Sequence, residues 1–290
     1  MTEYSLPQID WKGDCPPCWE RLDRLDWTAG LAFESFGVRL GVRVNDPAVL
    51  ERVAALLPPG WRPAASPLVE GLYSLKVAVP SPSKSVRRYH LLYQGVGQIA
   101  RTQDLEAALA ILEADLHTQV ASQSSERLFV HAGVAAWNGR AIVIPGRSFS
   151  GKTSLVAALV RAGATYYSDE YAVFDDAGQV YPYARPLALR DASGEAQPAR
   201  TVESLGGTAG TGPLPVGTIV AAEYNAGSRW QPRPLSQAQA MMTLLDNTLQ
   251  VRRQPQRTMD TLQKVAMGAG AVRGKRGEAE TAASWILEHC

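Results

Sequence analysis

The feature that most constrains the fold is an eight-residue segment, GRSFSGKT from Gly146 to Thr153, that follows the apolar run AIVIP and precedes the amphipathic stretch SLVAALVRAG. It fits the pattern G-x-x-x-x-G-K-[ST] in full, a pattern that is specific when it lies between a strand and a helix. An Asn138–Gly139 pair between two apolar runs predicts a tight hairpin, whose second strand leads into the segment. The sequence therefore predicts an α/β fold in which this glycine-rich loop joins a buried strand to a helix.

The glycine-rich loop has the composition of a phosphate-binding site, although a chance glycine-rich turn is the alternative. Its glycines let backbone N–H groups turn inward, and the helix that we expect from Gly151 to Ala162 directs its positive end at the same point. Lys152 would pair with β- and γ-phosphate oxygens, and the Thr153 hydroxyl would bind Mg²⁺. ATP and Mg²⁺ are therefore the expected ligands. The residues expected to bind the nucleotide are Gly146, Arg147, Ser148, Phe149, Ser150, Gly151, Lys152, Thr153 and Ser154.

Two adjacent acids, Asp169 and Glu170, follow the expected helix after a short run, ATYYS. We expect this run to return as a short parallel strand, which would bring Asp169 and Gly146 to the same carboxyl edge of the sheet. Phosphate transfer to an alcohol uses one carboxylate to position the metal and one to accept the hydroxyl proton. The sequence therefore favours a kinase, and a solvated strand end is the alternative for both acids.

The loop and the acids together resemble the C-terminal domain of HPr kinase/phosphorylase, which has a G-x-x-x-x-G-K-S loop followed one helix later by Ala-Asp-Asp. Here the corresponding residues are GRSFSGKT and Ser168-Asp169-Glu170. The resemblance implies an HPr-kinase/PEP-carboxykinase-like P-loop core, with Asp169 as the proton acceptor and Glu170 as a Mg²⁺ ligand. The family also carries a His-Gly two strands before the loop, which implies that His131 approaches the transferred phosphate.

The resemblance covers His131 to Pro186, roughly a fifth of the chain. Glu170 stands where the family has Asp, and the family's later block rich in Gly-Lys-Asn and Ile-Glu-Val-Ala-Ala is absent from Gly217 onward. The chain is therefore similar to the divergent HPr-kinase-related group, some of whose members phosphorylate serines of peptides. This similarity implies transfer of the γ-phosphate of ATP to a serine of a peptide or small protein.

Several further residues have two interpretations each. Arg185 follows the acids by one hairpin and would stabilise charge on the transferring phosphate, or it is an ordinary surface arginine. His131 is either a site residue or a core or edge histidine bonded to the backbone. The basic cluster Arg273, Lys275 and Arg276 is either a solvated face or a binding site for phosphate or an acidic peptide.

Other functions remain open beside serine phosphorylation. The acceptor would alternatively be a small-molecule alcohol, again with Asp169 as the base. A protein that binds ATP as a regulator or sensor needs only the loop and the metal ligands, and would transfer little phosphate. A GTPase switch is disfavoured because the chain contains no N-K-x-D tetrapeptide to read the guanine base.

Changes in composition along the chain predict three parts. Residues 1–30 form an arm with a short helix, and residues 31–125 form a small α/β domain whose helices begin at the caps Asp46 and Asp104. The polar segment SQSSE ends this domain. Residues 126–290 then form the HPr-kinase-like domain that carries the glycine-rich loop.

Composition also disfavours several kinds of partner. The chain has 290 residues, of which 46% are apolar and 20% charged, as in ordinary globular proteins. Its net charge of +1 gives no overall attraction to nucleic acid or acidic membranes. No run approaches the roughly 18 apolar residues of a membrane-spanning helix, and three cysteines without a secretory signal indicate a reducing compartment. We therefore expect a cytoplasmic protein without nucleic-acid or membrane partners, and a homo-oligomer is left open.

Overall fold

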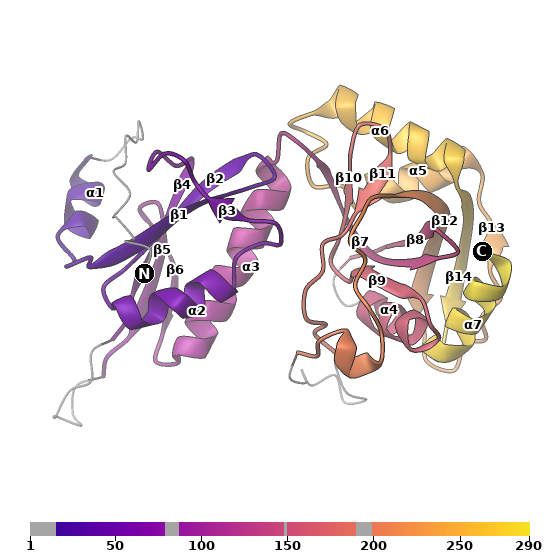
Figure 1. Cartoon of the computed structure of the whole chain (residues 1–290), viewed down its shortest axis with the longest axis horizontal. Coiled ribbons are helices and arrows are strands. Elements are labelled where there is room, and N and C mark those ends of the chain that lie inside the picture. The colour runs from indigo at the N-terminus through magenta and orange to yellow at the C-terminus, as the bar shows by residue number, and fades with distance from the viewer. Residues whose placement is uncertain (1–15, 79–86, 148–149, 190–198) are drawn as a thin grey trace. The chain divides into compact units, whose positions relative to one another are not determined.

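The chain folds into two compact units, Met1–Ser125 and Glu126–Cys290, which divide within the polar segment SQSSE. A computed structural model of the chain describes residues 16–78, 87–147, 150–189 and 199–290. Each unit combines one β-sheet with helices, so the chain has the α/β fold that the sequence predicts (Figure 1). No helix within the described ranges is long and apolar enough to cross a lipid bilayer.

The first unit is a six-stranded sheet with the order β3-β1-β2-β4-β5-β6. Its elements are α1 (Pro16–Asp23), β1 (Ala29–Ser35), β2 (Val38–Val44), the 3₁₀ turn η1 (Pro47–Val49), α2 (Leu50–Ala55), β3 (Arg62–Pro63), β4 (Gly71–Lys76), β5 (His90–Gln94), β6 (Gly97–Thr102) and α3 (Leu105–Gln123). Neighbouring strands are antiparallel except β2 and β4. Helices α2 and α3 bury their apolar residues against the sheet.

Local signals explain most of the first unit. The side chain of Asp46 accepts a hydrogen bond from the Ala48 N–H and begins η1, and Asp104 accepts one from the Glu106 N–H and begins α3, so both predicted caps are confirmed. The sequence interpretation did not identify β1, however, and its boundary between arm and domain at residue 30 falls inside this strand. Strand β1 is joined to β2 by Phe36 and Gly37, which have φ angles of 48° and 76°.

The second unit contains an eight-stranded sheet with the order β11-β10-β7-β8-β12-β14-β13, in which β9 pairs with β7. Its elements are β7 (Leu128–Trp137), β8 (Arg140–Pro145), α4 (Lys152–Arg161), β9 (Thr165–Ser168), β10 (Tyr171–Phe174), β11 (Gln179–Tyr181), η2 (Glu203–Leu205), β12 (Leu214–Tyr224), β13 (Arg233–Pro234), α5 (Gln237–Leu245), α6 (Pro255–Gly268), β14 (Gly270–Arg276) and α7 (Ala279–His289). Strands β8, β12 and β14 are parallel neighbours, so their carboxyl ends lie at one edge of the sheet.

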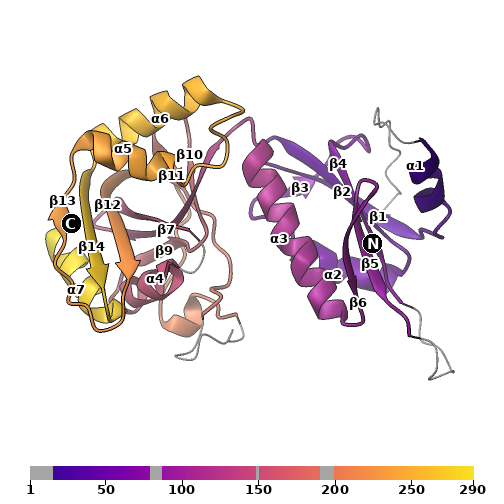
Figure 2. The same cartoon turned by 180° about the vertical axis from the view of Figure 1, so that it is seen from behind.

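Helices cover both faces of the second sheet. Helices α4 and α7 pack on one face through residues such as Leu159 and Ile286, and α5 and α6 pack on the other through Leu244 and Leu262. Figure 2 shows this unit from behind, with the sheet between the two helix pairs. The strand β8, which precedes the glycine-rich loop, is buried between these layers along almost its whole length.

One strand of the second unit is parallel to β8, as predicted, but is not its direct neighbour. ATYYS contains β9, and both β8 and β9 pair antiparallel with β7, which lies between them. The β7–β8 hairpin causes this, because β7 already occupies the side of β8 to which α4 returns the chain. The expected meeting of strand ends still occurs, since Pro145 lies opposite Ala132 and Ser168 lies opposite Val134 on the same strand.

Candidate functional site

The glycine-rich loop links β8 to α4, and its two glycines have close neighbours. The Gly146 N–H donates to the His131 carbonyl at 3.2 Å, which fixes the start of the loop on β7. A Cβ atom on Gly146 would lie 2.6 Å from Ser150 Oγ, and one on Gly151 would lie 2.5 Å from Arg276 Nη2. Gly151 has a φ of 83° and precedes the first residue of α4. The positive φ of Gly151 therefore disfavours a side chain there, whereas a side chain at Gly146 would displace the Ser150 hydroxyl.

Other residues of the loop differ in their surroundings. The Ser150 hydroxyl is buried and has no hydrogen-bond partner within the described ranges. A buried hydroxyl of this kind is unfavourable unless a ligand or water satisfies it. Arg147 and Ser154 are exposed, whereas Ser148 and Phe149 lie outside the described residues.

Lys152 is the first residue of α4 and is 7% exposed. Its Nζ donates to the Arg147 carbonyl at 2.8 Å, so the lysine closes over the loop. Burial lowers the pKa of Lys152 to about 8, and the nearby carboxylates of Asp169 and Glu170 oppose that shift. A positive charge is therefore held in a poorly solvated position at the amino end of a helix, where an anion would stabilise it.

Asp169 lies at the bend between β9 and β10 and is surrounded by hydrogen-bond partners. The Tyr166 hydroxyl lies 3.0 Å from Asp169 Oδ1 and 2.9 Å from the Arg185 carbonyl. Burial raises the pKa of Asp169, against the opposing effects of Tyr166, Thr153 and Arg185. Asp169 is therefore not a solvated strand end, and its raised pKa makes it a better proton acceptor than an ordinary aspartate.

Glu170 forms an ion pair with Arg185, which lies after β11. The buried Ser168 hydroxyl accepts the backbone N–H groups of Glu170 at 3.1 Å and Tyr171 at 3.0 Å, which holds the bend that presents both acids. The Glu170 and Arg185 side chains are 32% and 20% exposed. Arg185 is thus part of the acidic cluster and not an isolated surface arginine.

His131 lies on β7 directly opposite Tyr171, and the two rings are 5.9 Å apart. Its backbone N–H donates to the Asn247 carbonyl at 2.7 Å. Burial, with a smaller effect of the Lys152 charge, lowers the pKa of His131 to about 4. The imidazole is therefore neutral near pH 7, so it offers a hydrogen bond to a ligand but not a positive charge.

Position 133, two residues after His131, requires a small residue. A Cβ atom on Gly133 would lie 2.6 Å from Val156 Cγ2 and 3.7 Å from Lys152 Cβ. The absent side chain lets the first turns of α4 approach β7 closely. The His131–Gly133 segment thus contacts both the loop and the acids, because Ala132 donates its N–H to the Glu170 carbonyl at 3.0 Å.

Arg276 is a site residue whose role the sequence interpretation missed. It ends β14 and is 2% exposed, and its Nη2 donates to the Gly151 carbonyl at 2.6 Å while its Nη1 donates to the Gly277 carbonyl at 2.9 Å. Arg273 and Lys275, its neighbours in the basic cluster, are exposed. In the sequence, Arg276 is recognisable only as an arginine that precedes a glycine at a strand end. This feature does not distinguish it from Arg273 and Lys275.

Replacing Arg276 should destabilise the second unit and loosen the loop. We expect Arg276→Met to lower the free energy of unfolding by about 2 kcal/mol, because two hydrogen bonds from a buried charged group are lost. Lys275→Met, at the exposed neighbouring position, is the matched control and should change it by less than about 0.5 kcal/mol. Urea unfolding of both variants measures the difference, and equal losses would show that the Arg276 contacts contribute nothing.

His131 should make the protein less stable in mild acid. Because its pKa falls from 6.5 in the unfolded chain to about 4 in the folded protein, the unfolded chain binds more protons between these values. Stability is then lost as the pH falls through this window, by about 2 kcal/mol at pH 5. His131→Gln should remove that part of the pH dependence in the protein without nucleotide. If the free energy of unfolding changed equally with pH in the two proteins, this assignment would be wrong.

Comparison with known proteins identifies no relative of this chain. The chain matches no protein-family model, and no curated protein is similar to it at a significant level. Within the described ranges, no group of three or more His, Cys, Asp or Glu residues is arranged to hold a metal ion. Any assignment of function therefore depends on the geometry of the glycine-rich loop and its neighbouring acids.

Proposed function

We propose that the second unit is an ATP- and Mg²⁺-dependent kinase, with an HPr-kinase/PEP-carboxykinase-like P-loop core, that transfers the γ-phosphate to a hydroxyl group. The observation that carries the proposal is that adjacent residues of β7 bind both the glycine-rich loop and the acids: the His131 carbonyl accepts the Gly146 N–H at 3.2 Å, and the Ala132 N–H donates to the Glu170 carbonyl at 3.0 Å. A phosphate-binding sequence and the half-buried carboxylate of Asp169 thus lie at one edge of a sheet, which is where open α/β sheets bind ligands.

In this proposal the loop binds the phosphates and Asp169 activates the acceptor. Backbone N–H groups and Lys152 neutralise the β- and γ-phosphates, and the unpartnered Ser150 hydroxyl gains a phosphate oxygen as its partner. The acceptor oxygen attacks the γ-phosphorus while its proton passes to the Asp169 carboxylate. The bond from the γ-phosphorus to the β,γ-bridging oxygen breaks, and ADP leaves.

The side chains near Asp169 fit a magnesium ion of the kind that kinases use. Mg²⁺ takes oxygen ligands and is commonly held by one or two carboxylates together with substrate phosphates. Thr153 and Glu170 are the residues that would hold it, next to Asp169. When bound, the ion would neutralise charge on the phosphates. Arg185, released from Glu170, would contribute a further positive charge to the transferring phosphate.

A serine of a peptide or small protein is the proposed acceptor, and a small-molecule alcohol is the second candidate. The test is to incubate the full chain with γ-labelled ATP, Mg²⁺ and separate peptide and metabolite fractions, and to follow the label by mass spectrometry. Label on a serine supports the proposal. Tight ATP binding with no label in any acceptor, even after long incubation, would instead support the sensor alternative.

A further inference from the structure

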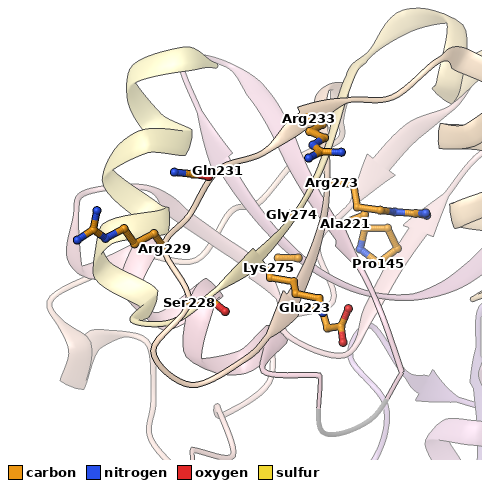
Figure 3. A pocket seen from close by; sticks show the side chains of 11 residues that line it. Pro145, Ala221, Glu223, Ser228, Arg229, Gln231, Arg233, Arg273, Gly274 and Lys275 are labelled. Atoms are coloured by element: carbon orange, nitrogen blue, oxygen red, sulfur yellow. The ribbon is translucent and has the colours of Figure 1, made fainter.

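A basic cavity of about 780 Å³ opens at the carboxyl ends of β12 and β14. Figure 3 shows Arg229 on one side of it and Arg233 and Arg273 on the other. Its volume is within the roughly 300–1,000 Å³ that is usual for ligand pockets. We call it the β14 cavity; its lining includes Pro145, Glu223, Arg229, Gln231, Arg233, Arg273 and Lys275.

The charges of the β14 cavity are unbalanced. Four cations, Arg229, Arg233, Arg273 and Lys275, line it with a single acid, Glu223. None of the four forms an ion pair with a carboxylate in the part of the chain that the structure describes. Cations of like sign around a concave surface create a positive potential that attracts anions. The chain as a whole has a net charge of only +1, so this potential is local.

The β14 cavity adjoins the glycine-rich loop. Pro145, which lines the cavity, immediately precedes Gly146, and Arg276 at the end of β14 binds the Gly151 carbonyl at 2.6 Å. Arg273 is held in place because its Nη2 donates to Thr243 Oγ1 at 2.9 Å. An anion in the cavity would therefore lie beside the proposed phosphate site, at the same edge of the sheet.

We propose that the β14 cavity binds carboxylates of the phosphate acceptor, and that the acceptor is an acidic peptide segment with glutamate or aspartate next to its serine. This inference rests on the proposed kinase function. A peptide fits better than a single phosphate, because the cations come from three segments, the 228–231 loop, β13 and β14, and the Arg229 and Arg273 side chains extend in opposite directions (Figure 3). Side chains spaced along an extended peptide would meet them one by one.

The test uses the full chain and a fluorescent peptide in which glutamates flank one serine, with a glutamine-flanked peptide as its neutral counterpart. We expect the acidic peptide to bind more tightly than the neutral one. Its affinity should fall as salt is raised, because the Debye length decreases from about 30 Å at 0.01 M to about 8 Å at physiological ionic strength. The double substitution Arg233→Ala with Lys275→Ala should weaken binding at least about fivefold.

Arg252→Ala is the matched control, since Arg252 is an exposed cation that does not line the cavity. It should leave peptide binding unchanged. Equal binding of the acidic and neutral peptides, or equal losses in the double variant and the control, would overturn the inference. So would a double variant that loses ATP affinity but keeps the peptide, which would assign the cavity to the nucleotide. Transfer of label from γ-labelled ATP, measured separately on the unaltered chain, tests the kinase proposal, so the two failures are distinguishable.

Discussion

Asp169→Asn is expected to abolish phosphate transfer while ATP still binds. Asparagine has nearly the same shape, and its carbonyl oxygen can still accept the Tyr166 hydroxyl group. It cannot accept a proton from the acceptor hydroxyl, and a positioned base contributes typically 10²–10⁴-fold to the rate. The rate of label transfer at saturating ATP should therefore fall by roughly that factor. Calorimetry of ATP binding should give an affinity close to that of the unaltered protein.

Asp175→Asn is the matched control for that experiment. Asp175 lies in the β10–β11 turn, where its Oδ1 accepts the Ala177 and Gln179 N–H groups at 2.9 Å. Asparagine serves turns of this kind equally well, so the rate of transfer should be unchanged. Full activity in Asp169→Asn would show that Asp169 is not the base. Loss of ATP binding in the same variant would show that it acts on the nucleotide instead.

The parts of the fold that were predictable from the sequence are those encoded by neighbouring residues. The Asn138–Gly139 hairpin forms as predicted, with both residues at positive φ, and the helix after the loop ends at Arg161, two residues before Gly163, whose φ is 103°. The turn before Gln179 also follows from local chemistry, because Asp175 bonds to its own backbone. In each case a short polar or glycine-containing segment determines the backbone without help from distant residues.

The site was predictable only where it follows the loop closely in the chain. Asp169 and Glu170 could be identified because one helix and one short strand separate them from Lys152. The position of β9 beside β7 could not, because β9 pairs with residues of β7 that lie 29 to 34 positions earlier in the chain, and both neighbours of β8 are other strands, β7 and β12. Periodicity within a strand does not specify which strand becomes its neighbour.

Long-range pairing also concealed the contribution of β14. Arg276 reaches Gly151 only because β12 lies between β8 and β14 in parallel register, with Tyr224 beside Arg276. The same register places Arg273 and Lys275 beside the carboxyl end of β12 and makes one wall of the β14 cavity. The sequence indicated a cluster of three cations, but only the sheet order separates the buried one, which holds the loop, from the two that face the cavity.

Lys152→Met is expected to change activity and stability in opposite directions. Methionine fills a similar volume without the charge, so phosphate transfer should fall by about 10²-fold or more, as it does when one charge-stabilising group is removed from an active site. The free energy of unfolding at pH 7 should instead rise by about 2 kcal/mol, because the folded protein no longer buries a cation whose pKa is lowered to about 8. Label transfer and urea unfolding measure the two effects.

The pH dependence identifies Lys152 as the source of the stability change. Its pKa is 10.5 in the unfolded chain and about 8 in the folded protein, so the unfolded chain binds more protons between these values. Stability of the unaltered protein therefore rises with pH across this window, and that rise should disappear in Lys152→Met. Lys264→Met, which removes a surface lysine bonded to the Asp176 carbonyl, is the control and should keep it. A lysine that is retained for a ligand is buried at a net loss of stability, so its removal should stabilise the protein. If Lys152→Met were less stable and transferred phosphate at the normal rate, the lysine would have a structural role instead.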